Sequence, residues 1–403
     1  MNLIKRRFEA EGHLIDSGIL TKIFNIIIEE NGDYEIIEFK IGKTNLDPSF
    51  MEIEVKCEDE FTLSNITSKL VNLGCYEKVI QEAIFKPAEK DKNVPDDFYS
   101  STNYKTKVYV KGKWRDVQNQ RMDGVIILNG DELYCKKLRD IKKGDLVLCS
   151  SDSVRIFPPF PERSTDEFGF MQNEVSSERS VDISVTMIAN EMKKQKAANG
   201  KIVVVAGPVV IHTGGAPYLA ELIRKGYIHG LLGGNATAVH DIECSFYGTS
   251  LGVDLKTGKP VDEGHRNHMR AINRINYHGS IKKAVENNDL KSGIMYEVIK
   301  SGIPFALAGS LRDDGPLPET ITDMIEAQAA YAEIIKDATM VIMLSSMLHS
   351  IATGNMLPAW VKTICVDINP AVVTKLADRG SGQAIGIVTD VGLFLKALGQ
   401  KLN

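Results

Sequence analysis

A hydrophobic pattern repeats six times in the C-terminal half of the chain, between residues 202 and 398. Each repeat is a short apolar run, then a turn of small residues, then a stretch with helical spacing. Apolar runs of four or five residues that alternate with helices predict βαβ units and a parallel sheet. A helix over about 181–198 precedes the first run, so this domain is expected to span 180–403. The predicted strands are Ile202–Ala206, Ile228–Leu232, Pro304–Ala308, Met340–Leu344, Thr363–Val366 and Ala384–Val388.

A smaller α/β pattern occupies residues 1–90. Isoleucines at helical spacing between residues 19 and 27 predict a helix that ends at Asn31-Gly32. Residues 50–59 alternate apolar and polar side chains, as a half-buried strand does. A second amphipathic helix follows and closes at Gly74, and residues 75–88 supply a last strand. The order β-α-β-β-α-β predicts a ferredoxin-like α+β unit.

Residues 104–160 have a third character, with short strands broken by Gly and Asp turns. They predict a small β-rich module, such as a compact barrel. Two polar, proline-containing segments flank this module. We interpret residues 87–103 and 158–180 as linkers or surface loops.

Composition and charge exclude several classes of function. The 403-residue chain is 43% hydrophobic and has a formal net charge of −5, which gives no general attraction to nucleic acid or to an anionic membrane. No apolar run approaches the ~20 residues of a membrane span, and the basic start lacks the apolar core of a signal peptide. Six scattered cysteines without a CxxC motif favour a reducing cytoplasm over a zinc ribbon or disulfide scaffold, and we expect no metal site.

The turns after the six strands are the first place to look for a nucleotide, because open parallel sheets bind ligands at the carboxyl ends of their strands. In ICVDINPAVV a buried strand ends in Asp367, followed by Ile368. A carboxylate there accepts hydrogen bonds from both adenosine ribose hydroxyls and repels a 2′-phosphate, which favours NAD over NADP. The alternative is a simple turn or helix N-cap.

Glycines and hydroxyls follow other strands. Gly233 and Gly234 lead into a helix near Asn235 or Ala236, where exposed N–H groups suit a phosphate or a carboxamide. The turn TDVG places Asp390 and Val391 at the last strand end, and HTGGAP forms a similar turn one unit before Gly233. The chain lacks the GxGxxG fingerprint, so these turns do not indicate an ordinary dinucleotide-binding half.

The turn after the fourth strand reads LSSMLHSIATGN. Its hydroxyls and N–H groups are candidates for contacts with a pyrophosphate. His349 on the same helix is a candidate base, although a histidine on a helix face more often hydrogen-bonds a carbonyl. The residues that we expect to contact the nucleotide here are Ser345, Ser346, Met347 and Leu348.

Two further segments carry charged side chains. In LAGSLRDDGPLPET, Asp313 and Asp314 follow a buried strand, and we expect them to hold an ammonium group, to carry protons or, for Asp313, to contact the cofactor. The alternative is a solvated turn. An insertion at residues 245–276 contains Asp254, His265 and Arg270, and a loop of this size is usually functional or disordered. Arg270 and Arg274 lie one helical turn apart and are candidates to grip a carboxylate, with a charged solvated face as the alternative.

Several of these motifs resemble a known family. GHLIDSG at residues 12–18 resembles a region shared with bifunctional lysine-oxoglutarate reductase/saccharopine dehydrogenase enzymes. GGNATAVHDIE, MLHSIATGN and VDINP are similar to the archaeal type of ornithine cyclodeaminase and to the C-terminal part of cyanobacterial arginine-catabolising enzymes. MLHSIATGNMLP with its strand also resembles the NAD domain of deoxyhypusine synthase. The resemblance covers almost the whole chain and implies a Rossmann-like, deoxyhypusine synthase-like parallel sheet that binds NAD in a non-standard way.

The reaction implied by this resemblance converts L-ornithine to L-proline and ammonia, with NAD recycled. NAD takes a hydride from the α-carbon, the δ-amine attacks the imine, ammonia leaves, and the cyclic imine takes the hydride back. The protein must supply a cation for the carboxylate, an anion for the δ-ammonium and a base. Arg270 or Arg274 is a candidate for the first role, and Asp254, Asp313 or Asp314 for the others. The chain is not similar to the crystallin-like bacterial ornithine cyclodeaminases, so their catalytic residues do not transfer.

Two other functions remain open from the sequence. One is a saccharopine- or amino-acid-dehydrogenase-like oxidoreductase with net NAD turnover. The other is a non-catalytic sensor of NAD or amino acids, in which the ferredoxin-like unit is regulatory. An edge strand in that unit favours a homo-oligomer.

Overall fold

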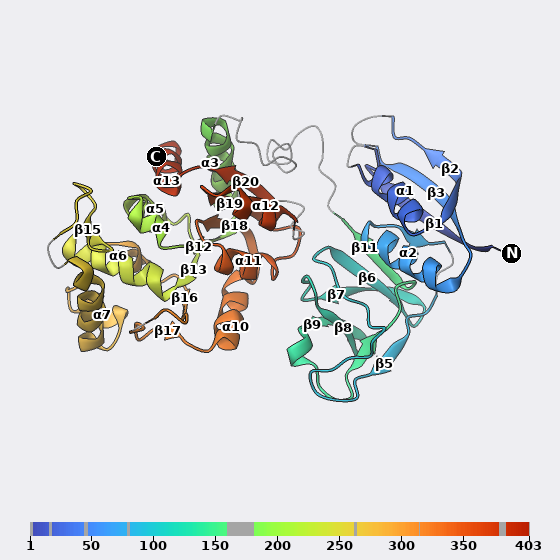
Figure 1. The fold of residues 1–403 in the computed structure, drawn as a ribbon, viewed down its shortest axis with the longest axis horizontal. Coiled ribbons are helices and arrows are strands. Elements are labelled where there is room, and N and C mark those ends of the chain that lie inside the picture. The colour runs from blue at the N-terminus through green and yellow to red at the C-terminus, as the bar shows by residue number, and fades with distance from the viewer. Residues whose placement is uncertain are drawn as a thin grey trace. The chain divides into compact units, whose positions relative to one another are not determined.

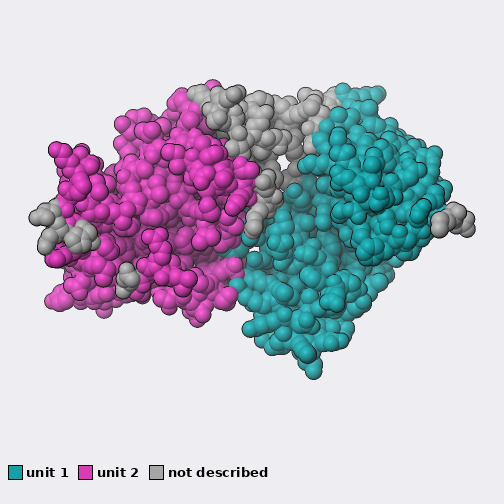
Figure 2. Space-filling view, viewed as in Figure 1, with its two compact units in different colours: residues 1–170, 355–360 teal, residues 171–354, 361–403 magenta. Residues whose placement is uncertain are grey.

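The computed structural model of the chain describes residues 3–15, 18–43, 47–78, 81–158, 181–261, 264–313, 315–378 and 384–402. It divides into two compact units (Figure 2). The first holds residues 1–170 together with 355–360. The second holds residues 171–354 and 361–403.

The N-terminal sheet has the ferredoxin-like order that the sequence predicts. Its strands lie in the order β2-β3-β1-β4 with antiparallel neighbours, and one face packs its apolar side chains against the two helices. Phe8, Ile23, Ile53 and Leu63 are completely buried in this core. The elements are β1 (Ile4–Gly12), α1 (Ile19–Glu29), β2 (Asp33–Lys40), β3 (Ser49–Cys57), α2 (Glu60–Asn72) and β4 (Tyr76–Glu77).

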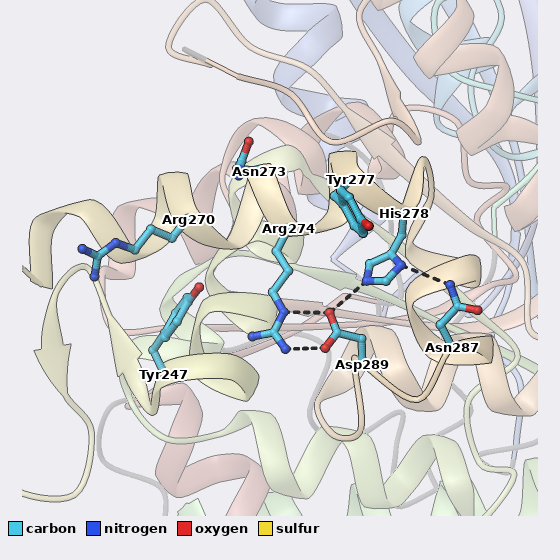
Figure 3. A pocket seen from close by; sticks show the side chains of 8 residues that line it. All are labelled: Tyr247, Arg270, Asn273, Arg274, Tyr277, His278, Asn287 and Asp289. Carbon is cyan, nitrogen blue, oxygen red and sulfur yellow. Dashed lines mark hydrogen bonds and ion pairs between the residues drawn. The ribbon is translucent and has the colours of Figure 1, made fainter.

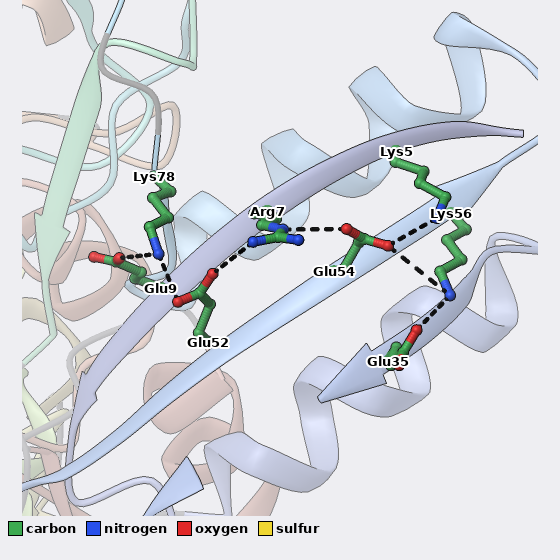
Figure 4. Close-up of polar contacts among 8 residues, drawn as sticks. All are labelled: Lys5, Arg7, Glu9, Glu35, Glu52, Glu54, Lys56 and Lys78. Atoms are coloured by element: carbon green, nitrogen blue, oxygen red, sulfur yellow. Dashed lines mark hydrogen bonds and ion pairs between the residues drawn. The ribbon is translucent and has the colours of Figure 1, made fainter. Parts of the chain in front are cut away.

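The other face of this sheet is charged, as the period of two in a strand requires. Lys5 and Arg7 on β1 both reach Glu54 on β3, each at 3.1 Å. Lys78 bonds Glu52 at 2.7 Å. Figure 4 shows that acidic and basic side chains alternate across the strands, so that each carboxylate meets a cation. The eight residues drawn there are Lys5, Arg7, Glu9, Glu35, Glu52, Glu54, Lys56 and Lys78.

The predicted strand at 75–88 is wrong as a single element. Tyr76–Glu77 pairs with β1, whereas β5 (Phe85–Pro87) pairs with a strand of the next sheet. The predicted linker or surface loop at 87–103 is irregular and mostly exposed between residues 89 and 98, but its end packs into the module. Tyr99 N–H bonds the Leu148 carbonyl, and the Ser101 hydroxyl bonds the Arg121 carbonyl, so polar groups of this segment are satisfied inside the module.

The β-rich module forms a seven-stranded sheet in the order β11-β6-β7-β9-β8-β10-β5. Its last strand ends at Phe157, and the predicted linker at 158–180 lies outside the described residues from 159 on. The strands not yet given are β6 (Lys105–Val110), β7 (Lys113–Gln118), β8 (Val125–Asn129), β9 (Glu132–Lys136), β10 (Leu146–Leu148) and β11 (Val154–Phe157).

The C-terminal sheet is parallel throughout, as the sequence predicts, with the order β17-β16-β13-β12-β18-β19-β20 (Figure 1). The pattern missed β17, which has only two residues. It also placed the second strand two residues early, so that Gly233 and Gly234 belong to the strand itself. The strands are β12 (Lys201–Ala206), β13 (Gly230–Gly234), β16 (Phe305–Ala308), β17 (Thr320–Ile321), β18 (Ala338–Leu344), β19 (Lys362–Asp367) and β20 (Ala384–Val388).

The strand order reverses at β12. The chain first builds outward through β13, β16 and β17, and then returns to add β18 on the other side of β12. In open α/β sheets a ligand crevice forms at the carboxyl ends where the order reverses. The fold therefore directs attention to the ends of β12 and β18.

Helices connect the strands of this sheet, and a separate two-stranded hairpin lies between α6 and α7 in the chain. The predicted insertion forms the hairpin β14 (Thr249–Ser250) and β15 (Val253–Asp254), and then a short 3₁₀ turn, Gly264–Arg266. The helices are α3 (Val181–Ala197), α4 (Val209–His212), α5 (Ala216–Arg224), α6 (Asn235–Tyr247), α7 (Asn267–His278), α8 (Ile281–Glu286), α9 (Ile294–Ser301), α10 (Met324–Ile335), α11 (Leu348–Gly354), α12 (Pro370–Asp378) and α13 (Val391–Lys401).

Candidate functional site

The backbone is tightly packed where the strand order reverses. Gly207, just after β12, donates its N–H to the Leu344 carbonyl at 2.9 Å. A Cβ on Gly207 would lie 2.0 Å from the Ser345 carbonyl oxygen, so only glycine fits there. Ser345 itself has φ 45°, which is costly for a residue with a side chain, and its N–H bonds the Val366 carbonyl. Such strain is typical of functional sites.

Asp367 lies beside this junction, because β18 and β19 are adjacent and Leu344 is in register with Val366. One carboxylate oxygen accepts the Asn369 N–H at 2.8 Å, which is the turn contact that the alternative interpretation expects. The second oxygen remains for another donor. Asp367 also follows Ser346 by about 20 positions, the spacing that joins phosphate turn and ribose carboxylate in dinucleotide-binding folds.

The other predicted cofactor residues of this region divide between buried and exposed. Ser346 and Val391 are buried, whereas Met347 and Leu348 are exposed. The strongly exposed Ile368 follows Asp367. Asp390 caps α13 by accepting the Leu393 N–H at 2.9 Å.

Asn235 does not cap its helix. Its side-chain oxygen accepts the Leu317 N–H at 3.0 Å and the Thr320 hydroxyl at 2.9 Å, so that it ties the loop after β16 to the start of α6. Gly234 is the N-cap residue, in extended backbone, and Ala236 is the next helical residue after Asn235. Gly233, Gly234 and Asn235 are all buried at the sheet edge.

A hydrogen-bond chain crosses the same edge from α10 to α11. The Tyr331 hydroxyl donates to the Gly233 carbonyl at 2.7 Å, and its oxygen lies 3.0 Å from His349 Nδ1. His349 Nε2 lies 3.0 Å from the position of a Cβ on Gly234. Burial lowers the pKa of His349 and raises that of Tyr331. The sequence pattern missed Tyr331, which looks like one more buried side chain on an amphipathic helix.

Two predicted acidic residues close local turns. Asp313 accepts the Ser310 N–H at 2.7 Å and the Ser310 hydroxyl at 3.1 Å. Asp254 accepts the N–H groups of Lys256 and Thr257, and hydrogen bonds from Thr257 hold its pKa below the usual range. Both contacts fit the interpretation as turn residues, although neither uses every lone pair of the carboxylates. Asp314 lies outside the described residues.

The predicted arginine pair on α7 does not act as a pair. Arg274 forms a two-point ion pair with Asp289, which also accepts from His278 at 2.9 Å (Figure 3). The Arg274 guanidinium lowers the pKa of Asp289 to about 2. Arg270 lines the same open pocket of about 600 Å³, and its side chain extends away from Asp289. The two-point contact occupies Arg274. Arg270 donates to Asn267 Oδ1 at 3.5 Å, and its pairing with a substrate carboxylate stays a prediction.

The remaining predicted residue, His265, lies in the 3₁₀ turn before α7, and its side chain is outside what the structure describes. Within the described residues, no group of three or more His, Cys, Asp or Glu side chains is placed to hold a metal ion. The same residues contain no helix with the length and apolarity needed to cross a membrane.

Sequence reasoning missed a second buried polar cluster, centred on Glu243 of α6. This completely buried carboxylate accepts from His240 Nδ1 at 3.0 Å, from the Thr249 hydroxyl at 2.8 Å and from the Gly252 N–H at 3.2 Å. The His212 ring packs edge-on against His240. The cluster anchors the β14–β15 hairpin on α6. Its signal in the sequence was the pair of acidic residues in AVHDIE, within a helix whose other residues carry no carboxylate.

Three families of sequence match consecutive parts of the chain. Residues 5–104 match the conserved region of LOR/SDH bifunctional enzymes, and residues 105–185 match the first region of the C-terminal part of ArgZ-like arginine dihydrolases. Residues 186–398 match the ArgZ-like C-terminal Rossmann fold.

Solved structures resemble the chain over most of its length. Apo ArgZ, a cyanobacterial arginine dihydrolase, matches 99% of the chain with a TM-score of 0.87 and 42% identity, and the chain spans 58% of it. A LOR/SDH protein of Methanococcus maripaludis S2 matches 80% of the chain and is itself covered to 98%, with a TM-score of 0.76 and 50% identity. The ternary complex of AgrE with ornithine and NAD⁺ matches 99% of the chain with a TM-score of 0.55 and 48% identity, and the chain spans 57% of it.

Curated relatives match from end to end. Ornithine cyclodeaminase of Methanocaldococcus jannaschii is 53% identical over the whole chain and over 97% of its own length. The bifunctional arginine dihydrolase/ornithine cyclodeaminase AgrE of Nostoc is 49% identical over 99% of the chain, which spans 58% of that larger protein. The chain belongs to the family formed by the archaeal ornithine cyclodeaminases and the C-terminal part of these cyanobacterial proteins.

Proposed function

We propose that the chain is an NAD-dependent ornithine cyclodeaminase, which converts L-ornithine to L-proline and ammonia. The observation that carries this proposal is the identity of 53% to the M. jannaschii enzyme across the full length of both proteins. The AgrE complex adds support, because a protein 48% identical to this chain binds both ornithine and NAD⁺.

The carboxyl edge of the C-terminal sheet fits NAD. Gly207 and Ser345 bring two backbone segments together without a side chain between them, and Asp367 presents a carboxylate beside them. We assign Asp367 to the ribose hydroxyls, and Ser345 and Ser346 to the pyrophosphate. The Gly233-Gly234 end of β13 lies across β12 from this pair and is assigned to the nicotinamide side. When bound, NAD supplies an acceptor for the α-hydrogen of ornithine as hydride and returns that hydride to the cyclised product.

The substrate side is assigned to α7 and the loop after β16. A Cβ on Gly315 would lie 3.7 Å from Met269 and from Ile272, so this loop packs against the first turns of α7. The contact brings the segment that carries Asp313 close to the segment that carries Arg270. We assign Arg270 to the ornithine carboxylate and Asp313 to the δ-ammonium group, since a guanidinium and a carboxylate are the complementary partners. Asp254, Asp314 and His265 stay as weaker candidates for the same side.

One assay tests the function. Purified protein is incubated with L-ornithine and a catalytic amount of NAD, and proline, ammonia and NADH are followed together. Equal amounts of proline and ammonia with no accumulation of NADH are expected. Accumulation of NADH would instead identify an amino-acid dehydrogenase, and NAD binding without turnover would identify a sensor.

A further inference from the structure

We propose that Nε2 of His349 is the proton acceptor for the amino groups of the substrate, an inference that rests on the proposed cyclodeaminase function. Each of the two amino groups must lose a proton before its nitrogen lone pair can take part in imine formation or ring closure. In the proposed step an N–H bond of the substrate ammonium breaks and its electron pair stays on nitrogen. The proton passes to Nε2, which leaves an imidazolium.

Tyr331 fixes which nitrogen of His349 is the acceptor. A carbonyl oxygen can only accept, so the Tyr331 O–H must donate to Gly233, at 2.7 Å. The Tyr331 oxygen is then left to accept from Nδ1–H, at 3.0 Å. In the neutral imidazole this leaves the lone pair on Nε2. The same contact holds Nδ1–H when Nε2 gains its proton, so the ring keeps its orientation through the step.

Nε2 of His349 lies against the glycine at the end of β13. Nε2 lies 3.0 Å from where a Cβ on Gly234 would be, so the absence of a side chain there leaves room for the ring at the end of β13. The ring is half-buried, and among the described residues Nε2 has no hydrogen-bond partner. α11 packs against β12 and β13, and the contact with Gly234 puts this nitrogen at the end of β13, to which we assigned the nicotinamide.

The surroundings favour the neutral form of the imidazole. α10, α12, β12 and β13 pack against α11. Among the described residues, the titratable side chain that contacts the ring is Tyr331, and no carboxylate or cation forms an ion pair with it. Burial lowers the pKa of His349 from its usual value near neutrality. The acceptor is therefore present at neutral pH and is lost as the pH falls below that lowered pKa.

Another histidine of this domain with an oriented ring is His240, which bonds a buried carboxylate. Its partner Glu243 also receives bonds from Thr249 and Gly252, which hold the β14–β15 hairpin. His240 is only 8% exposed, whereas the ring of His349 is half-buried. We therefore assign the structural role to His240 and the proton transfer to His349.

The test compares two His→Asn variants of the full-length protein. In His349→Asn the amide nitrogen replaces Nδ1 as donor to Tyr331, and the acceptor at Nε2 is removed. His229→Asn is the matched control: this half-buried histidine precedes the opposite end of β13 and accepts the Ile202 N–H through Nδ1, a contact that the Asn oxygen can replace. NAD affinity, kcat, KM for ornithine and the pH profile of kcat/KM are measured for each.

We expect His349→Asn to bind NAD within about threefold of wild type, to lose roughly 10²–10⁴-fold in kcat with little change in KM, and to lose the acidic limb of the pH profile. His229→Asn should match wild type in all four measurements. If His349→Asn folds poorly, Tyr331→Phe replaces it and should move the acidic limb, because Nδ1 loses its acceptor.

Full kcat with an intact acidic limb in His349→Asn would overturn the proposal, and so would loss of that limb in His240→Asn instead. A wild-type protein that binds NAD but makes no proline would contradict the cyclodeaminase function itself. These results are distinct, because the first two need an active wild-type enzyme.

Discussion

The outer face of the N-terminal sheet and the carboxyl edge of the C-terminal sheet are both rich in polar groups, but they use them differently. On the outer face, which is the face turned away from α1 and α2, Glu52 and Glu54 each bond a cation on the neighbouring strand β1 (Figure 4). At the carboxyl edge, one oxygen of Asp367 and Nε2 of His349 have no partner in the described residues. A high density of charge therefore does not by itself indicate a binding site. Oriented polar groups that still lack a hydrogen-bond partner are the better indicator.

The largest effect is expected from Gly207→Ala at the carboxyl edge. The new Cβ would meet the Ser345 carbonyl at 2.0 Å, and both partners are backbone that neighbouring strands hold in place. We expect a loss of about 3 kcal/mol in the free energy of unfolding and no measurable NAD binding. Urea denaturation and NAD titration measure both.

Gly399→Ala is the control for that variant. Gly399 lies on helix α13, and a Cβ there would make an ordinary contact with Tyr218 at 3.7 Å. The free energy of unfolding should therefore be unchanged or slightly higher. If Gly207→Ala behaves like Gly399→Ala, the close backbone approach at the carboxyl edge is not needed for stability or for NAD binding.

Asp367→Ala should weaken NAD binding by roughly 1–3 kcal/mol, which is the scale of hydrogen bonds to a charged group. Calorimetric titration with NAD measures the change. Asp59→Ala removes an aspartate of the N-terminal unit that accepts the Thr62 N–H at a helix start, and it should leave NAD affinity untouched. Unchanged affinity in Asp367→Ala would remove the ribose assignment and leave Asp367 as a turn residue.

Asp289→Asn tests whether the charged residues of the α7 pocket stabilise the fold, like those on the outer face of the N-terminal sheet, or bind a ligand, as we propose for the carboxyl edge. The pKa of Asp289 is lowered to about 2, so its ion pair stabilises the fold above the ordinary carboxyl pKa near 4 and is lost as the pH falls toward 2. Since Arg274 is 43% exposed, solvent screening limits the effect to about 1 kcal/mol at pH 7. Denaturation of both proteins from pH 7 to pH 2 should show the difference shrinking between pH 4 and 2, with ornithine turnover unaffected. A large drop in turnover would place Asp289 in the substrate site.

Arg7→Gln on the outer face should have the smallest effect. Arg7 is half-exposed, and Lys5 and Lys78 stay paired with Glu54 and Glu52, so we expect only a small loss in unfolding free energy at low salt and less at high salt. NAD binding and turnover should equal those of wild type. An effect on turnover would show that this charged face contributes to function and not only to stability.

The sequence pattern predicted the elements that repeat and missed those that depend on distant partners. Apolar runs located all six long strands of the parallel sheet, because a strand buried on both faces must be apolar. The pattern placed Phe85–Pro87 in the first sheet, since no local signal shows that its partner is Leu146–Leu148. The polar segment 87–103 looked like a linker for the same reason.

The candidate residues of the site were chosen from residue type at strand ends, and their roles stay predictions. Asp367 and Ser345 lie side by side, as expected from adjacent parallel strands. The sequence pattern did not predict the ion pair of Arg274, because its partner Asp289 follows 15 residues later, beyond the end of α8. The proposed role of His349 as proton acceptor depends on its contacts with Tyr331 and Gly234. These residues come from two other elements, so no spacing in the sequence could reveal their arrangement.

One feature of the fold bears on how the chain is made. Residues 355–360 count with the first compact unit, although the residues on both sides of them belong to the second. Within that unit the Ala359 N–H donates to the Asn103 carbonyl at 2.9 Å. During translation the N-terminal unit leaves the ribosome first, yet this contact forms only after residue 360 has emerged. The order of synthesis and the order of assembly therefore differ, and a chain released before residue 355 would carry its first unit incomplete.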